Sequence, residues 1–181
     1  MTPGGARPGG HRVVLLRHAK AEAGGGVVDA LRPLALAGRR QCAAVGARLA
    51  ASGLIPERVL VSSAVRTRQT WELTRGAFGD AGDPDVDVLD ELYDARVSDV
   101  LQLLRVVDER VATVLVVGHE PTMSGAAGAF ALAEGDREHA AHLAHVHAGL
   151  STGSYAVLEI GAWADLDRGT ARIVEVVRAP H

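Results

Sequence analysis

Three short apolar segments of this chain each end abruptly in polar residues, and this feature constrains the fold more than any other. They are residues 13–16, followed by Arg17-His18; residues 59–61, followed by Ser62-Ser63; and residues 114–117, followed by Gly118-His119. Short continuous apolar runs are typical of strands that are buried on both faces of a sheet. An arginine beside a histidine at the tip of such a strand indicates an anion site, although chance alone can supply one such pair.

Segments with the apolar spacing of helices alternate with these strands. Helices are predicted at 34–51, 64–76, 97–108 and 121–133, and further strands at 86–89, 154–160 and 171–177. This alternation predicts an α/β fold of three layers, α/β/α, with a mostly parallel central sheet and helices on both faces. The hydroxyls of Ser62 and Ser63 are predicted to cap the helix that follows them. Ligands of open α/β sheets bind at the carboxyl ends of the strands, so the polar strand ends converge if their strands are parallel neighbours.

Length and composition exclude several classes of protein. A chain of 181 residues is predicted to form one domain, over 12–181, and the Gly- and Pro-rich residues 1–11 a disordered lead-in. A net charge of −3 leaves no broad basic surface for nucleic acid. No apolar run approaches the roughly 20 residues that a membrane helix needs. Cys42 is the single cysteine, so no internal disulfide forms. We expect a cytoplasmic protein, and the sequence does not indicate its oligomeric state.

The converging residues have the chemistry of phosphoryl transfer. Arg17 and Arg66 offer guanidinium forks for an oxyanion, and the start of the helix adds free N–H groups. A neutral imidazole, as on His18, is a nucleophile near neutral pH, and His119 can donate a hydrogen bond to the phosphoryl oxygens. An acid must protonate the leaving group, and Glu91, after the next predicted strand, is the leading candidate. The chain has neither a nucleotide-type P-loop nor an obvious metal centre, so we expect no metal and no cofactor.

A second group of histidines allows two interpretations. It consists of His139, His142, His145 and His147. Their spacing is compatible with metal binding, but few carboxylates accompany them. The favoured interpretation is a partly helical surface excursion, and a wall of the substrate entrance is an alternative.

The ordered motifs resemble the histidine phosphatase superfamily, and within it the short SixA-type phosphohistidine phosphatases. The matching segments are Leu15 to Lys20 around Arg17-His18, Val61 to Thr70 around Arg66, Val117 to Pro121 around His119, and Asp29 with Arg32-Pro33-Leu34 and Gly38. The resemblance covers about residues 12 to 160 and implies a phosphoglycerate mutase-like fold. It implies that His18 accepts the phosphoryl group, that Arg17, Arg66 and His119 form the phosphate pocket, and that Glu91 is the acid. Arg32 either lines the pocket or forms a salt bridge with Asp29.

Two residues depart from the family pattern. Ala19 stands where the family usually has glycine, and its methyl group narrows the approach of the backbone to phosphate. Glu120 stands where the family usually has asparagine. Its negative charge either points away from the phosphate or weakens anion binding.

The predicted function is that of a metal-free phosphatase acting through a phosphohistidine intermediate. The expected substrate is phosphohistidine on a signalling protein. The alternatives are a broad-specificity phosphomonoesterase, a phosphoglycerate mutase-like enzyme, and a non-catalytic module that binds phosphate or a phosphoprotein. The sequence does not identify the physiological substrate, and specificity is expected to depend on the loops at 22–33, 78–98 and 134–153.

Overall fold

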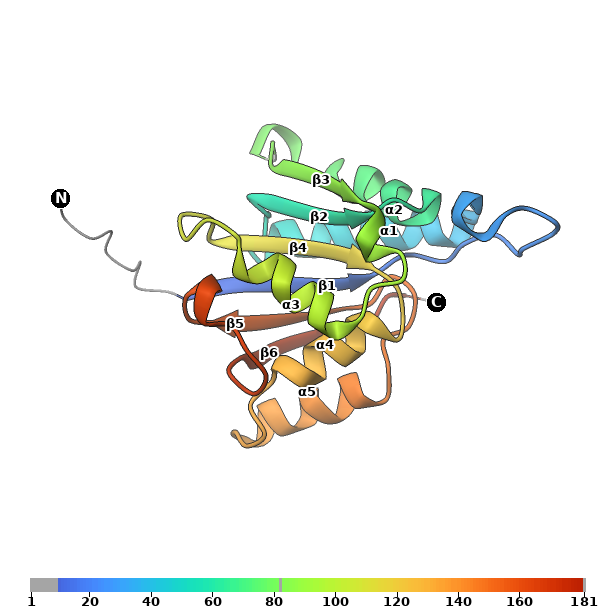
Figure 1. Ribbon diagram of the computed structural model, residues 1–181. Helices are drawn as coiled ribbons and strands as arrows, with labels where there is room; N and C mark the ends of the chain where they lie inside the picture. Colours follow the sequence, from blue (N-terminus) through green and yellow to red (C-terminus); the bar gives the residue numbers. More distant parts are fainter. Residues whose placement is uncertain (1–9, 82, 181) are drawn as a thin grey trace.

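A single mixed sheet forms the centre of the protein (Figure 1). The computed structural model describes residues 10–81 and 83–180. Within these ranges the strands are β1 (His11–Arg17), β2 (Arg58–Ser62), β3 (Asp85–Leu89), β4 (Thr113–Gly118), β5 (Tyr155–Ile160) and β6 (Arg172–Val177). Their order in the sheet is β3-β2-β4-β1-β5-β6. The first four in this order are parallel to one another, and β5 and β6 run antiparallel to their neighbours. The predicted, mostly parallel sheet is confirmed.

Helices cover both faces of this sheet (Figure 1). They are α1 (Leu36–Ala51), α2 (Val65–Arg75), α3 (Val97–Arg105), α4 (Thr122–Phe130) and α5 (Arg137–His147). Alternate residues of each strand enter one of two apolar clusters, because successive side chains of a strand point to opposite faces. In β1, Val14 and Leu16 join the cluster that contains Val45 and Leu49 of α1, whereas Val13 and Leu15 join the cluster on the side of α3, α4 and α5. The predicted three layers are therefore confirmed.

The register of the sheet brings the polar strand ends together. Strands β2, β4 and β1 are adjacent and parallel, with Arg17 of β1 opposite Gly118 of β4. Val61 of β2 also lies opposite Val117 of β4, so the three strands end at the same edge of the sheet. The convergence that the sequence predicts for His18 and His119 follows from this register.

The start of α2 differs from the prediction. The residue before the first turn is Ala64, and no side chain caps the helix. Ser62 is instead the last residue of β2, and its hydroxyl lies 2.8 Å from Nε2 of His119. The predicted serine cap is wrong because the strand continues through Ser62 and turns that side chain toward the neighbouring strand end.

The first strand, predicted over residues 12–17, begins one residue earlier, at His11. The His11 ring contacts the carbonyl oxygen of Gly161 at 2.6 Å and that of Glu109 at 2.9 Å, which fixes this residue in the sheet. Residues 1–9 of the predicted lead-in lie outside the described residues. No helix in the described part of the chain is long and apolar enough to cross a membrane.

The second group of histidines lies on α5, which packs against β6 and α4. His139 is 2% exposed, with its Nε2 2.9 Å from the Leu132 carbonyl oxygen. Its Nδ1 accepts a hydrogen bond from the backbone N–H of Ile173 at 3.2 Å. The segment is therefore a surface helix whose buried side chains, His139 and Val146, face the core. Over residues 10–81 and 83–180, no three His, Cys, Asp or Glu side chains form a group that could hold a metal ion.

Candidate active site

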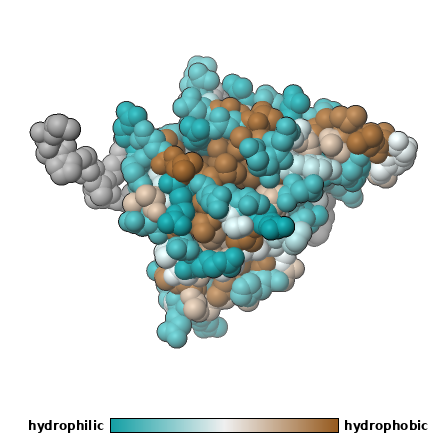
Figure 2. Space-filling view, in the orientation of Figure 1, coloured by the Kyte–Doolittle hydropathy of each residue, from teal (hydrophilic) through white to brown (hydrophobic). Residues whose placement is uncertain are grey.

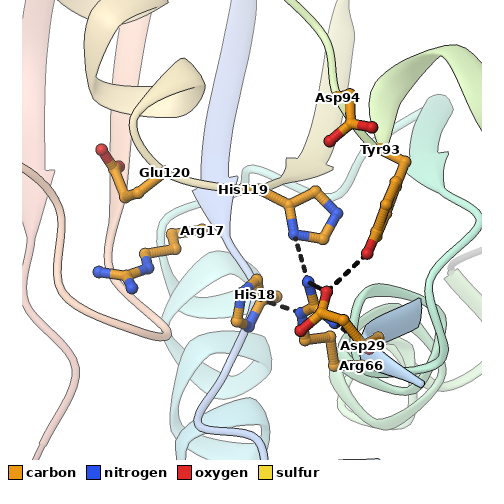
Figure 3. A pocket seen from close by; sticks show the side chains of 8 residues that line it. All are labelled: Arg17, His18, Asp29, Arg66, Tyr93, Asp94, His119 and Glu120. Carbon is orange, nitrogen blue, oxygen red and sulfur yellow. Dashed lines mark hydrogen bonds and ion pairs between the residues drawn. The ribbon is translucent and has the colours of Figure 1, made fainter. Parts of the chain in front are cut away.

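A polar pocket of about 200 Å³ lies at the carboxyl ends of β1 and β4 (Figure 3). Its lining consists of Arg17 and His18 at the end of β1, Asp29 in the β1–α1 loop, Arg66 of α2, Tyr93 and Asp94 before α3, and His119 and Glu120 after β4. Four of the predicted site residues, Arg17, His18, Arg66 and His119, therefore meet in one place. Asp29, Tyr93 and Asp94 come from two of the loops that were expected to set specificity.

His18 presents an unprotonated ring nitrogen to this pocket. Its Nδ1 lies 2.8 Å from the carbonyl oxygen of Ala19. A carbonyl oxygen can only accept, so Nδ1 carries the proton and donates it. Nε2 is then the free base, and it accepts a hydrogen bond from Nε of Arg66 at 3.3 Å. The lone pair of Nε2 therefore faces the guanidinium group that can hold an anion (Figure 3).

Arg66 connects the other groups of the pocket. Its side chain is buried, and it donates through Nη1 to the carbonyl oxygen of Asp29 at 2.7 Å and through Nη2 to Asp29 Oδ2 at 2.9 Å. Nη2 also lies 3.3 Å from Nδ1 of His119. One planar guanidinium thus fixes both imidazoles and the β1–α1 loop relative to one another.

His119 is held by Ser62 on the side away from Arg66. The 2.8 Å contact between Nε2 and the Ser62 hydroxyl supports either tautomer, because a hydroxyl can accept or donate. With Nε2 protonated, Nδ1 accepts from Arg66. With the Ser62 hydroxyl donating instead, Nδ1 carries a proton that it can give to a phosphoryl oxygen, but it then cannot accept from Arg66, because a guanidinium N–H can only donate.

Arg17 supplies a second guanidinium. Its Nη1 donates to the carbonyl oxygen of Leu150 at 2.7 Å, and the backbone N–H of Gly153 donates to the carbonyl oxygen of Arg17 at 3.2 Å. Its Nε is buried and has no hydrogen-bond partner in the described part of the chain. Buried donors are normally paired, so this N–H is suited to an anionic ligand.

The β1–α1 loop places Asp29 in the pocket through Arg32. Arg32 donates from Nε and Nη2 to the carbonyl oxygen of Glu22 at 3.0 and 2.8 Å. Its Nη1 donates to Asp29 Oδ1 at 2.8 Å. The structure thus shows the salt bridge with Asp29, and does not place Arg32 in the described pocket lining, because all three of its nitrogens are engaged across the loop. The hydroxyl of Tyr93, Arg32 and Arg66 hold the pKa of Asp29 well below its usual range.

A glycine at the start of α1 keeps this loop close to the helix. A Cβ atom at Gly38 would lie 2.1 Å from the carbonyl oxygen of Lys20. The same oxygen accepts the N–H of Ala35 at 2.9 Å. Only a residue without a side chain allows this approach, which explains the glycine of the Asp-x-x-Arg-Pro-Leu-x-x-x-Gly segment.

The described lining does not include Glu91, the acid expected from the sequence. Glu91 lies in a single turn of 3₁₀ helix, Asp90–Leu92, where its side chain is exposed and that of Leu92 is buried. The carboxylate nearest in sequence that lines the pocket is Asp94. Sequence reasoning missed Tyr93 and Asp94, and the only available signal was their position after the same strand.

Glu120 lines the pocket, but its carboxylate points away from His18 and Arg66 (Figure 3). Its carboxylate accepts hydrogen bonds from the hydroxyl and the backbone N–H of Ser124, the latter at 3.2 Å. These bonds hold the carboxylate at the start of α4, beside the pocket and on the same side as Arg17 (Figure 3).

Solved structures of other proteins share this fold. No protein-family model matches the sequence. A structure that carries the name phosphohistidine phosphatase SixA, from Nakamurella multipartitia, is 31% identical, with a TM-score of 0.81 over 96% of this chain and 98% of the other. A structure of the same name from Agrobacterium tumefaciens is also 31% identical, with a TM-score of 0.76 over 94% and 99%. The chain belongs to the histidine phosphatase superfamily, in its SixA-type branch.

Membership in this superfamily places the chain among enzymes that hydrolyse phosphoryl groups. An uncharacterized protein of Mycobacterium tuberculosis (strain ATCC 25618 / H37Rv) is a further relative. It is 36% identical over 160 residues, which cover 88% of this chain and 96% of the relative. The likeness therefore extends over nearly the whole length of each protein.

Both pocket imidazoles of this histidine phosphatase are neutral over an unusually wide pH range. Burial, together with the charges of Arg66 and Arg17, lowers the pKa of His18 to about 4, although the hydrogen bond to the Ala19 carbonyl oxygen acts in the opposite direction. Burial, His18 and Arg66 lower the pKa of His119 to about 3. The ring of His18 is therefore unprotonated well below neutral pH.

We expect NMR titration of the free enzyme to show this directly. Because both folded-state pKa values lie below 6.5, the rings stay neutral as the pH falls through 6.5 and take up a proton only near pH 4 and pH 3. A midpoint between 6 and 7 for His18 would contradict the buried, arginine-flanked site.

Proposed function

We propose that this protein is a metal-free phosphatase that forms a phosphoryl intermediate on His18 and acts on phosphohistidine borne by another protein. The observation that carries the proposal is the geometry of His18. Its Nδ1 proton is given to the Ala19 carbonyl oxygen, and its free Nε2 faces Arg66. A fixed, neutral imidazole beside two guanidinium groups meets the needs of covalent phosphoryl transfer.

In the first step, Nε2 of His18 attacks the phosphorus atom of the substrate. A new N–P bond forms as the N–P bond of the substrate breaks, and its electron pair stays on the departing imidazole nitrogen. Where the other ring nitrogen of the substrate carries a proton, the imidazole departs neutral. Arg17, Arg66 and His119 stabilise the negative charge on the three phosphoryl oxygens.

In the second step, water attacks the phosphoryl group on His18. The N–P bond breaks, its electron pair returns to Nε2, and inorganic phosphate is released. The proton that the water loses passes to a carboxylate, and Asp94 and Glu120 are the lining carboxylates without an arginine partner among the described ion pairs. For Glu91 to accept this proton, it would have to do so from outside the described pocket lining.

The surface beside the pocket supports a protein substrate. The β1–α1 loop carries exposed apolar side chains, with Val27 50%, Val28 67% and Leu31 59% exposed. Figure 2 shows the brown patch at the end of the molecule where this loop projects. Asp29, which lines the pocket, lies between these residues in the same loop. Exposed apolar side chains that gather beside a site are typical of protein–protein contacts.

A turnover screen tests the proposal. Release of phosphate is measured with a protein phosphorylated on histidine, with simple phosphomonoesters and with sugar phosphates, using His18→Ala as the blank. We expect the phosphohistidine protein to have the highest kcat/KM. Higher values with the phosphomonoesters would favour a broad-specificity phosphomonoesterase, and exchange between phosphoglycerates without release would favour a mutase. Binding without turnover of any substrate would favour a non-catalytic module.

A further inference from the structure

Two residues of the pocket lining have carboxylates without a cation of their own. They are Asp94 and Glu120, called the acidic rim below, and neither forms an ion pair within residues 10–81 and 83–180. Figure 3 shows them on either side of His119, away from Asp29 and Arg66. The third carboxylate, Asp29, is bound by both Arg66 and Arg32.

The charge balance of this pocket is unusual for a site that binds an anion. The charge of Arg66 is already met by Asp29 at 2.9 Å. Arg17 is then the guanidinium of the lining without a carboxylate partner among the described ion pairs. Both lining histidines are neutral near pH 7 because burial disfavours their charged forms. The lining therefore holds three carboxylates against two guanidinium groups, and with Arg32, which binds Asp29 from outside it, the charges balance to zero, so the site has no net positive charge for an anion.

We propose that the acidic rim selects phosphohistidines that carry positive charge next to the phosphoryl group, that is, a protonated imidazole ring on a basic peptide segment. The inference rests on the proposed function and names the substrate more closely. A phosphoryl group with further negative charge beside it would meet the repulsion of Asp94 and Glu120. A cationic neighbour gains their attraction while Arg17 and Arg66 hold the phosphoryl oxygens.

The same preference assists the first chemical step. A protonated ring leaves as neutral imidazole, so no separate acid has to deliver a proton during cleavage of the N–P bond. Carboxylates beside the ring favour the protonated form of the substrate, because an opposite charge favours the charged form of a titratable group. The exposed position of Asp94 places it where the incoming segment passes.

Three phosphohistidine peptides test the inference. They differ only in the residues that flank the phosphohistidine, which are lysine, serine or glutamate, and kcat/KM is measured for each. We expect the order lysine, serine, glutamate. Partly exposed charge pairs are individually weak. Relative to the serine peptide, we therefore expect each flanking charge to change kcat/KM by about threefold for each carboxylate of the acidic rim. Hydrolysis of the intermediate on His18 is common to all three peptides and cancels from these ratios.

Asp94→Asn should compress the ratio between the lysine and glutamate peptides by about threefold or more, because one rim charge is gone. Asp90→Asn is the matched control, since it removes an exposed carboxylate of the same segment that is not among the lining residues. It should leave the ratio unchanged. Added salt should also compress the wild-type ratio, because exposed charges are screened.

The outcomes separate this inference from the proposed function. Release of phosphate from all three peptides at equal kcat/KM would overturn the selection by charge and leave the phosphatase proposal standing. Equal compression by Asp94→Asn and Asp90→Asn would also overturn it, because the effect would then come from the general field of the protein. Release from none of the peptides, with phosphomonoesters turned over by the same preparation, would instead contradict the proposed substrate.

Discussion

Replacement of His18 by alanine is expected to lower phosphatase turnover by at least about 10³-fold. The imidazole is the group that forms the N–P bond in the proposed mechanism, and the other lining imidazole, that of His119, differs from it in the partner of its second ring nitrogen. Nε2 of His119 faces Ser62, and its Nδ1 lies 3.3 Å from Arg66. The measurement is phosphate release from a phosphohistidine protein under single-turnover and steady-state conditions.

His147→Ala is the matched control for this change. It removes an exposed histidine of α5 that is absent from the described pocket lining, and it should retain wild-type turnover. Circular dichroism should show that His18→Ala remains folded, because His18 makes its one ring contact to the backbone locally, with Ala19. Folded His18→Ala protein with more than a tenth of wild-type turnover would show that another residue accepts the phosphoryl group.

Replacement of Arg66 by alanine is expected to lower kcat/KM by about 10²–10³-fold, the usual cost of removing a donor that stabilises transition-state charge. Arg66 also fixes the pocket, since it contacts both imidazoles and binds Asp29 twice. Its loss therefore removes the hydrogen bonds that hold the β1–α1 loop and also a hydrogen-bond donor to the phosphoryl oxygens of the substrate. Steady-state kinetics with the phosphohistidine protein give the measurement.

The variant Arg66→Lys distinguishes the contribution of the positive charge at position 66 from that of the planar guanidinium geometry. An ammonium group keeps the positive charge but cannot make the planar, multidentate contacts of a guanidinium. Arg66→Lys should therefore recover less than a tenth of the lost kcat/KM. Arg68→Ala, which removes an exposed arginine of the same helix, should be indistinguishable from the wild type. Full recovery by lysine would contradict the organising role of the guanidinium.

The central part of the site could be predicted from the sequence because it depends on strands. Apolar runs identify β1, β2 and β4, and the carboxyl ends of parallel neighbours must meet at one edge. Arg17, His18 and His119 follow such runs directly, and Arg66 is in the first turn of the next helix. Their convergence needed only that the three strands be adjacent and parallel, which the observed register confirms.

Residues outside strands could not be placed in the same way. Glu91 and Asp94 both follow β3, but a turn of 3₁₀ helix leaves Glu91 exposed while Asp94 reaches the pocket. Residue type does not determine the backbone angles of such a connection, so the direction of each side chain was not predictable. A shift of a few residues in a loop is enough to exchange one carboxylate for another.

Arg32 and Ser62 show a second reason for the limits of sequence analysis. Both have side chains that fit several partners, and the tertiary structure decides between them. Arg32 is bound to Glu22 and Asp29 across the loop, so it positions Asp29. Ser62 contacts His119, a residue 57 positions away in the chain. Long-range pairings of this kind leave no signal in the local pattern.

The most direct test of the account is the chemical identity of the trapped intermediate. Enzyme mixed with radiolabelled phosphohistidine protein is quenched within milliseconds in base, digested, and mapped by mass spectrometry. The account predicts a base-stable, acid-labile phosphoryl group on the peptide that contains His18, and its absence from His18→Ala. An acid-stable adduct, or a phosphoryl group on any other residue, would contradict it.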